Sequence, residues 1–509
     1  MASADSFDVV VIGAGTAGLV TAAGVAGLGG RAALIERDRL GGDCLWTGCV
    51  PSKALIASAR LAHDLARGPE FGLPALSPRI DTGAVLESVR AARAVIQPHD
   101  DPERFRAMGV EVVEGEARFV SGRKVLVGER RLGGRRFVIA TGSRPAIPPI
   151  PGLEEAGYFT HVEAFDRAAL PNSLAVIGGG AIGVELAQAF ARLGVEVTVV
   201  EMLDRLLARE EPELVERLEA VLREEGVRVL TGRRVERVER ANGRRRLHLA
   251  RDPYEGSGSA GDRAAGADSA AGGRGGSHPA RDPGAVVEAD EILVATGRRA
   301  NTEGLGLEAA GVDTDRGWVI VDDRLRTTAR HILAAGDVTG GHLFTHVADH
   351  EARVAVQNAL FPIRARIRYD TVPWCTYTDP ELARVGLREE EARERHGDAV
   401  GTHVYDLSGL DRAVTERAAR GVVKVVTGRG GKILGGHVLA RDAGTMIAEI
   451  ALAMDRGIGL GALSTLVHAY PTMSEGVRRA ADAYRRSLLT GWRKRALDLA
   501  LRLGRSFPA

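Results

Sequence analysis

Two stretches of the chain repeat one pattern of apolar and polar positions. Residues 7–12 and 174–177 are short apolar runs, typical of buried parallel strands. Each run is followed by a glycine-rich turn and a helical stretch, and a second apolar run, at 32–35 or 197–200, ends at a glutamate. This order of strand, turn, helix, strand and acid predicts two βαβ units of dinucleotide-binding type.

The first unit carries the fingerprint Gly-x-Gly-x-x-Gly, closed by Glu36. We expect Gly13 to permit the tight turn, Gly15 to let a pyrophosphate approach the backbone, and Gly18 to allow close helix packing. Glu36 can accept hydrogen bonds from ribose hydroxyls. A glycine-rich turn without a ligand is the alternative, and the complete βαβ context disfavours it.

The second unit repeats the fingerprint at Gly178, Gly180 and Gly183. Its closing acid, Glu201, favours a free ribose 2′-hydroxyl and repels a 2′-phosphate. The next residue is Met202 and not an arginine, which predicts NAD(H) in preference to NADP(H). Arg205 lies nearby in the sequence and weakens this argument.

Three further apolar strands end in residues suited to ligand binding. Two of them end in Ala-Thr-Gly, at Thr141-Gly142 and at Gly297, and predict strands that return beneath a nucleotide. The third ends in Gly-Asp at Asp337, whose carboxylate could bind a sugar-like polyol. A helix N-cap is a second sound role for Asp337.

Cys44 and Cys49 form a close pair in a chain with only one other cysteine, Cys375. A chain this poor in cysteine has no disulfide framework, so the pair indicates redox chemistry. Zinc binding is the structural alternative, but no second Cys or His pair has ligand spacing, and we predict no metal site. Cys375 is either a third active-site thiol or a buried, inert cysteine, and we favour the second.

Length and charge narrow the class of protein. The 509 residues predict about three domains. The 68 basic and 67 acidic side chains give no support for nucleic-acid binding. The first residues contain no targeting segment, which predicts a soluble cytoplasmic protein.

In this order, these elements resemble the flavin-dependent pyridine nucleotide-disulfide oxidoreductases, over about residues 6–485. The most specific element is Gly-Gly-x-Cys-x4-Gly-Cys-Val-Pro-Ser-Lys, which ends at Lys53. The resemblance implies an α/β fold, with two Rossmann-like dinucleotide-binding domains and an α+β dimerisation domain. The expected boundaries are 1–155 and 297–368 for the FAD-binding domain, 156–296 for the NAD(P)-binding domain with a disordered insert at 252–286, 369–489 for the dimerisation domain, and 490–509 for a basic C-terminal tail.

The resemblance also implies roles for these residues. FAD would be held by the first fingerprint, Glu36 and Asp337, and NAD(H) by the second fingerprint and Glu201. NADH would reduce the flavin, and the flavin would reduce a Cys44–Cys49 disulfide. Cys49 would contact the flavin and Cys44 would exchange with the substrate; a helix N-terminus would support thiolate formation.

Lys53 would lie near the flavin and pair with Glu185, where a cation stabilises the charge of the reduced ring. The alternative for Lys53 is a solvated helix lysine. Trp46, between the two cysteines, either shapes the substrate entrance or packs.

The chain departs from the family near its C-terminus. Lipoamide dehydrogenase and glutathione reductase have a catalytic histidine, supplied across the dimer, where this chain has Tyr470, a poor base near neutral pH. His468 either compensates or is structural, and Glu475 matches the family's orienting carboxylate. A tyrosine resembles mercuric reductase, although no cysteine pair stands near the end of this sequence.

The leading prediction is a homodimer that reduces a small-molecule disulfide, a metal-thiolate or another oxidant with NAD(P)H, as mercuric reductase-like proteins do. One alternative is dihydrolipoyl dehydrogenase. Another is a membrane-associated quinone or electron-transfer flavoprotein that docks through the basic, amphipathic tail. For the tail itself, we favour a terminal helix packed on the dimer.

Overall fold

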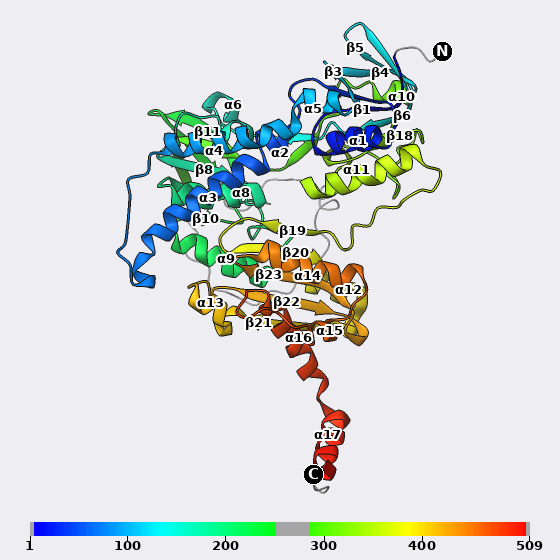
Figure 1. The fold of residues 1–509 in the computed structure, drawn as a ribbon. Helices are drawn as coiled ribbons and strands as arrows, with labels where there is room; N and C mark the ends of the chain where they lie inside the picture. The colour runs from blue at the N-terminus through cyan, green and yellow to red at the C-terminus, as the bar shows by residue number, and fades with distance from the viewer. Residues whose placement is uncertain (1–4, 251–284, 505–509) are drawn as a thin grey trace.

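The computed structural model describes residues 5–250 and 285–504, which form three modules (Figure 1). The insert predicted at 252–286 falls almost wholly outside these residues, and Val286 begins strand β13. The first module is built from two separate segments of the chain, because strand β18 returns to the sheet that contains β1 and β6.

The first module is a seven-stranded sheet in the order β3-β2-β1-β6-β5-β4, with β18 paired to β6. Its elements are β1 (Ser6–Ile12), β2 (Ala32–Glu36), β3 (Glu111–Glu114), β4 (Ala117–Ser121), β5 (Lys124–Val127), β6 (Arg130–Ile139), β18 (Ile332–Ala334), α1 (Thr16–Gly27) and α11 (Thr345–Leu360). Val9 and Val11 of β1 pack in the core shared with α1 and α11, whereas Val10 and Ile12 pack in the core on the opposite face. Burial on both faces explains the uninterrupted apolar run in the sequence.

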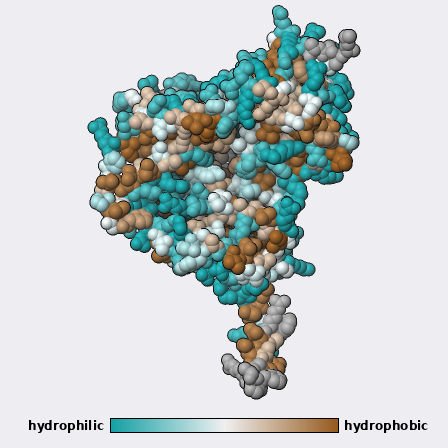
Figure 2. Space-filling view, viewed as in Figure 1, coloured by the Kyte–Doolittle hydropathy of each residue, from teal (hydrophilic) through white to brown (hydrophobic). Residues whose placement is uncertain are grey.

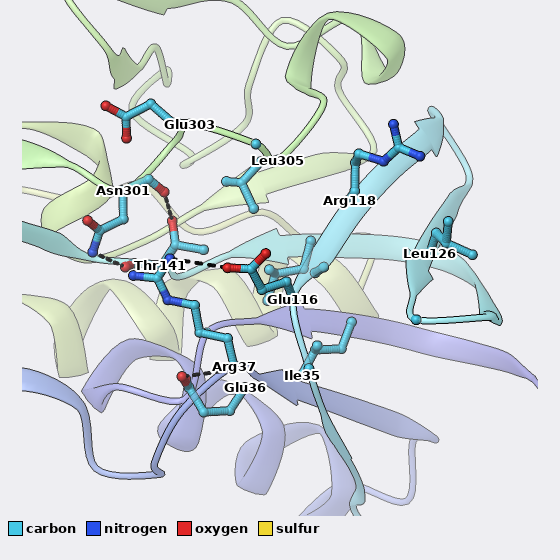
Figure 3. Close-up of a pocket in the computed structure, with 16 residues that line it drawn as sticks. Ile35, Glu36, Arg37, Glu116, Arg118, Leu126, Thr141, Asn301, Glu303 and Leu305 are labelled. Carbon is cyan, nitrogen blue, oxygen red and sulfur yellow. Dashed lines mark hydrogen bonds and ion pairs between the residues drawn. The ribbon is translucent and has the colours of Figure 1, made fainter.

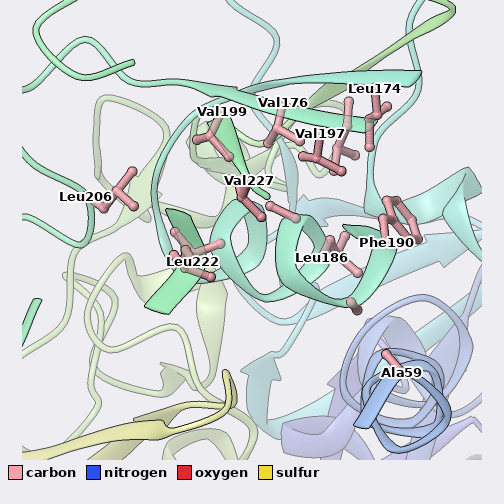
Figure 4. Close-up of a cluster of buried hydrophobic side chains, with 14 of the residues drawn as sticks. Ala59, Leu174, Val176, Leu186, Phe190, Val197, Val199, Leu206, Leu222 and Val227 are labelled. Carbon is pink, nitrogen blue, oxygen red and sulfur yellow. The ribbon is translucent and has the colours of Figure 1, made fainter. Parts of the chain in front are cut away.

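The second module has a four-stranded parallel sheet in the order β10-β9-β8-β14, beside a three-stranded antiparallel sheet. Its elements are β8 (Ser173–Ile177), β9 (Glu196–Val200), β10 (Arg228–Leu230), β14 (Glu291–Val294), β11 (Val235–Ala241), β12 (Arg244–Leu249), β13 (Val286–Ala289), α8 (Ala181–Arg192) and α9 (Pro212–Glu224). Figure 4 shows Val176 and Val199 of the sheet packed near Leu186 and Phe190 of α8. Ala59 of α3 (Cys49–Ala66) joins the same core, so α3 and α8 lie side by side.

The third module is a five-stranded antiparallel sheet in the order β19-β20-β23-β22-β21. Its elements are β19 (Pro373–Thr376), β20 (Glu381–Gly386), β21 (Gly401–Asp406), β22 (Val422–Thr427), β23 (Ile433–Ala440), α14 (Ala443–Asp455) and α16 (Glu475–Leu488). Val423 and Val438 of the sheet share a core with Ile450 of α14 and Val477 of α16.

The remaining α-helices and strands lie within or between these modules. They are α2 (Gly42–Trp46), α4 (Thr82–Ile96), α5 (Pro102–Ala107), α6 (Leu153–Ala156), α7 (His161–Ala164), α10 (Leu307–Ala310), α12 (Glu389–His396), α13 (Asp411–Thr415), α15 (Leu460–Leu463), β7 (Ser143–Pro145), β15 (Arg298–Ala300), β16 (Thr314–Asp315) and β17 (Trp318–Val319). Strands β7 and β15 pair with each other between the first two modules, and each directly follows one Ala-Thr-Gly turn. The predicted α/β class with two dinucleotide-binding units is confirmed, whereas the domain boundaries stay predictions.

The C-terminal helix α17 (Gly491–Gly504) extends away from the body of the molecule (Figure 1). Figure 2 shows hydrophobic residues along it, and its leucines at 497, 499, 501 and 503 are exposed. In the part of the chain that the structure describes, no helix is both long and apolar enough to cross a bilayer. The fold gives no support to membrane contact through this tail, which stays a prediction.

Candidate active site

The first glycine fingerprint forms a tight turn against the neighbouring strand. Gly13 has a φ of +98°, and a Cβ atom there would lie 2.5 Å from the carbonyl oxygen of Ala140. A Cβ atom on Gly18 would lie 1.8 Å from the carbonyl oxygen of Gly13, so only glycine lets α1 start this close to β1. Gly15 precedes the helix, and its backbone faces Gly42. The result is an open helix N-terminus, which suits a pyrophosphate.

A cavity of about 270 Å³ opens beside this turn (Figure 3). Its lining includes the predicted residues Gly13, Glu36 and Thr141. The Glu36 carboxylate accepts hydrogen bonds from the backbone amides of Ala14 (2.7 Å) and Arg37 (2.9 Å), which hold it at the mouth of the turn. Glycine cradle, helix N-terminus and fixed carboxylate together fit the adenosine half of a dinucleotide such as FAD.

Other residues of this cavity were not predicted. Asn301 forms two hydrogen bonds with Thr141. The side-chain amide of Asn301 donates to the backbone carbonyl of Thr141 (2.9 Å), and the backbone carbonyl of Asn301 accepts from the Thr141 hydroxyl (2.8 Å). Further lining residues that the sequence interpretation missed are Arg37, Gly115, Glu116, Ala117, Arg118, Glu303 and Leu305. All of them except Arg37, which follows Glu36, come from segments without a fingerprint, and no local signal marked them.

The second fingerprint repeats this geometry. A Cβ atom on Gly183 would lie 2.1 Å from the carbonyl oxygen of Gly178. The Glu201 carboxylate accepts hydrogen bonds from the backbone amides of Gly179 (2.5 Å) and Leu203 (2.7 Å). Arg205 instead donates to the carbonyl of Ala208 (2.9 Å). Glu201 therefore occupies in the second module the position that Glu36 occupies in the first.

Asp337 belongs to a cluster of partly buried charges. Its carboxylate accepts a hydrogen bond from the Ser143 hydroxyl (2.7 Å) and lies 3.5 Å from the Arg298 guanidinium. Burial raises the pKa of Asp337 above its usual range, although Arg298 and Ser143 oppose the rise. Arg298 also donates to Asp43 (2.5 Å), the residue before Cys44, and contacts the His161 ring (3.1 Å).

Asp43 couples this cluster to the cysteine pair. Burial works against its ionisation, but hydrogen bonding with His161 and the Arg298 charge hold the pKa of Asp43 well below its usual range. The sequence interpretation assigned no role to Asp43, Ser143, His161 or Arg298. The four stand far apart in the sequence, and only the fold brings them together.

The two cysteines are free thiols at the junction of two helices. Cys44 lies in α2, and Cys49 is the first residue of α3, where the helix N-terminus stabilises a thiolate. A hydrogen bond from Cys44 lowers the pKa of Cys49 to about 6, with help from Thr345 and Lys53 and against the effect of burial. The Thr345 hydroxyl lies 3.2 Å from the Cys49 sulfur. The same Cys44–Cys49 bond raises the pKa of Cys44, so Cys49 is the thiolate of the pair.

Lys53 and Glu185 form an ion pair across α3 and α8, with 2.8 Å between Nζ and Oε2. Glu185 is buried, and its other carboxylate oxygen accepts a hydrogen bond from the backbone amide of Tyr377 (2.8 Å). Lys53 is therefore a paired residue of the site and not a solvated helix lysine.

The predicted C-terminal residues have partners of their own, separate from this pair. Tyr470 is 70% exposed, and its hydroxyl donates to Asp411 (2.7 Å). His468 has a buried ring that contacts Glu449 (3.1 Å), which fits a structural histidine. Glu475 is buried and accepts a hydrogen bond from Arg478 (3.0 Å).

Trp46 packs against its neighbours in the sequence and α4. Its indole donates to the carbonyl of Leu40 (2.7 Å), and the guanidinium groups of Arg39 and Arg93 lie 4.1 and 5.5 Å from its ring.

The third cysteine lies in strand β19. Burial raises the pKa of the Cys375 thiol, which fits an inert cysteine. Over the described ranges, no group of three or more His, Cys, Asp or Glu side chains is arranged to hold a metal ion.

Thr345 offers a direct test of thiolate stabilisation. Replacing it with valine removes the hydroxyl beside Cys49, so we expect the Cys49 pKa to rise from about 6 by roughly half a unit to one unit. The thiolate fraction near pH 6 then falls, and less so at pH 8. A pH titration of thiolate absorbance in the reduced protein measures this shift, with Thr345→Ser as the control that keeps the hydroxyl. An unchanged midpoint in the valine variant would contradict the assignment.

Comparison with known proteins places this site among redox enzymes. Residues 7–352 match the family described as pyridine nucleotide-disulphide oxidoreductase, and residues 372–481 match its dimerisation domain. A mercuric reductase of Bacillus cereus is 34% identical over 93% of this chain and 71% of its own length. A dihydrolipoyl dehydrogenase of Chlorobaculum tepidum is 36% identical over 94% of this chain and 97% of its own length.

Solved structures agree with these sequence matches. The Cu(II) complex of RclA, an HOCl-induced flavoprotein disulfide reductase from Escherichia coli, superposes with a TM-score of 0.79 at 28% identity, over 94% of this chain and 99% of that chain. LpdA from Mycobacterium tuberculosis gives a TM-score of 0.80 at 28% identity, over 94% and 99% of the two chains.

Proposed function

The chain belongs to the pyridine nucleotide-disulphide oxidoreductase family, whose members are FAD-dependent and use NAD(P)H, and we propose that it is a homodimeric reductase of small-molecule disulfides or thiol-bound metals. The observation that carries this proposal is the placement of the two thiols: Cys49 begins α3 with its sulfur 3.2 Å from the Thr345 hydroxyl, and Cys44 lies in the preceding helix α2. Hydrogen bonding between the two thiols lowers the pKa of Cys49 and raises that of Cys44. Bound FAD would supply two-electron transfer between NAD(P)H and this pair. The two glycine turns, Glu36 and Asp337 fit the binding of that cofactor and of NAD(P)H.

The pair can then carry out thiol–disulfide exchange without a separate base. Cys44 passes its proton to the Cys49 thiolate and attacks one sulfur of the substrate disulfide. The other substrate sulfur leaves and takes that proton from Cys49, which becomes a thiolate again. The Cys49 thiolate next attacks the Cys44 sulfur of the mixed disulfide. The second substrate thiol leaves with a proton from solvent, and two electrons have passed from the pair to the substrate.

This use of Cys49 as base fits the position of Tyr470. Hydrogen bonding to Asp411 raises the pKa of Tyr470, so the phenol stays protonated at neutral pH. In the proposed homodimer, Tyr470 would face the dithiol of the other subunit, as its position in the family implies, and could protonate a departing thiolate. A strong base for oxidising a dithiol substrate is absent from this position, which favours disulfide reduction over the reverse reaction.

Anaerobic titration with NADH tests the proposed function. We expect a long-wavelength absorbance from a thiolate beside the oxidised flavin in the wild type and none in Cys49→Ser. A substrate panel of glutathione disulfide, lipoamide, Hg(II), Cu(II) and quinones then identifies the oxidant; Cu(II) is included because RclA was captured as its Cu(II) complex. Faster oxidation of dihydrolipoamide than reduction of any panel member would favour the dihydrolipoyl dehydrogenase alternative. No thiolate absorbance in the wild type would refute the dithiol route.

Glu201 supports a preference for NADH. Its carboxylate is fixed at the end of β9 by two backbone amides, where a 2′-phosphate would be repelled. We expect Glu201→Ala to raise the KM for NADH by roughly tenfold and to improve use of NADPH. Steady-state kinetics with both nucleotides measure the change. Glu196→Ala, at the exposed opposite end of the same strand, is the matched control; equal effects of the two variants would contradict this role.

A further inference from the structure

The ammonium group of Lys53 lies where helix α3 meets the second and third modules. Lys53 comes from α3, and Glu185, its ion-pair partner, comes from α8 in the second module. Tyr377 comes from the connection between β19 and β20 in the third module, and its ring centre lies 4.6 Å from the Lys53 Nζ. The backbone amide of Tyr377 donates to the second carboxylate oxygen of Glu185, so each of the three residues contacts the other two.

We propose that Tyr377 is a positioning residue of the redox site, whose ring holds the Lys53 ammonium against Glu185 and beside Cys49. This proposal rests on the proposed function, because that function makes Cys49 the thiolate of the redox pair. A cation over an aromatic face is attracted by the negative charge of the π system, and more strongly where water is partly excluded. Lys53 is only partly exposed, so the ring replaces solvation that the ammonium loses.

The aromatic ring, and not the hydroxyl, makes this contact. Among the residues that the structure describes, none forms a hydrogen bond with the Tyr377 hydroxyl, and the residue as a whole is 38% exposed. Burial raises the pKa of Tyr377 to about 12, so the phenol stays neutral. A phenylalanine would therefore preserve the contact, whereas an aliphatic side chain of similar size would not.

The position of Lys53 matters because two opposite charges act on Cys49. Lys53 lowers the pKa of the thiol and Glu185 raises it. If the ring were lost, the Lys53 ammonium could turn toward solvent while the buried Glu185 carboxylate stayed in place. The pKa of Cys49 would then rise. The other titratable groups that face this centre are Cys44, beside Cys49, and Cys375 and Glu381, beside Tyr377.

The test compares Tyr377→Leu and Tyr377→Phe in the FAD-loaded enzyme after two-electron reduction. The readout is the pH at which the long-wavelength thiolate absorbance is half lost, which does not depend on turnover. We expect the leucine variant to lower the acid dissociation constant of Cys49 by roughly threefold to tenfold, which moves the midpoint to higher pH. The phenylalanine variant should titrate as the wild type. Tyr377→Met, which fills the space without a π face, carries the same expectation as leucine if that variant is unstable.

A Lys53→Met background separates the contact from a general packing effect. Without the cation, Tyr377→Leu should cause no further shift in the midpoint. Tyr158→Leu, which removes a tyrosine elsewhere in the second module, is the control for any aromatic loss. Equal midpoints in the wild type, Leu and Met variants would overturn the proposal, as would a shift in Phe equal to that in Leu or one that persists with Lys53→Met. Absorbance that survives in Cys49→Ser would instead show that the proposed function itself has failed.

Discussion

Replacing Cys49 with serine should lower NADH-dependent disulfide reduction by roughly a thousandfold or more, because a key nucleophile is removed and serine cannot form the S–S bond that closes the cycle. The variant should still bind FAD, since the glycine turn and the Glu36 cavity do not include this sulfur. Turnover with the best substrate of the panel and the absorbance of bound flavin measure the two properties on the same sample.

Cys44→Ser should lose turnover to a similar extent but keep the thiolate absorbance at Cys49. Cys375→Ser is the matched control, because burial keeps that thiol protonated, and its activity should stay within about twofold of the wild type. Substantial disulfide reduction by the Cys49 variant would place the reactive thiol elsewhere. A large loss in the Cys375 variant would instead make the third cysteine part of the site.

Arg192→Leu should destabilise the protein by about 3–5 kcal/mol, the cost of leaving buried carboxylates without their cation. The Arg192 side chain is 5% exposed and forms ion pairs with Glu225 (2.6 Å) and Asp379 (2.9 Å). These partners follow α9 in the second module and β19 in the third, so one guanidinium joins two modules. Urea denaturation of the FAD-saturated protein, followed by circular dichroism, measures the loss.

Arg223→Leu provides the comparison for this prediction. Arg223 pairs with Glu219 at 2.7 Å, but it is far more exposed, so its loss should cost no more than about 1 kcal/mol. If both variants unfold at the same urea concentration, the burial of Arg192 does not explain the contribution of its ion pairs to stability. A change in the slope of the transition for Arg192→Leu, with an intermediate plateau, would show that the modules had become independent.

The parts of the site that the sequence predicted are those with local signals. Gly18 is required by a contact with the carbonyl of Gly13, five residues earlier, and Gly13 itself has a left-handed φ that favours glycine. Cys44, Cys49 and Lys53 lie in one short segment, and a helix starts at Cys49 as expected. Such features depend on spacing along the chain, and spacing can be read without a structure.

The parts that could not be predicted depend on distant segments. Arg298 contacts Asp43 across 255 residues of sequence, and Asn301 contacts Thr141 across 160. Neither contact has a periodic or motif signal. The C-terminal motif shows the same limit: its residues were found, but the partners of Tyr470 and His468 are Asp411 and Glu449, which come from other elements.

The contacts that Lys53 and Arg192 make between modules also bear on how such proteins can be recombined. A chimera that exchanges only the second module would bring a foreign α8 against the native α3 and the native β19–β20 connection. Glu185 and Arg192 would then meet partners selected in another protein, even if every strand were intact. Transplanting nucleotide preference between relatives should therefore succeed when α3 and residues 377–381 travel with the donor module, and fail when the cut follows the sheet boundaries alone.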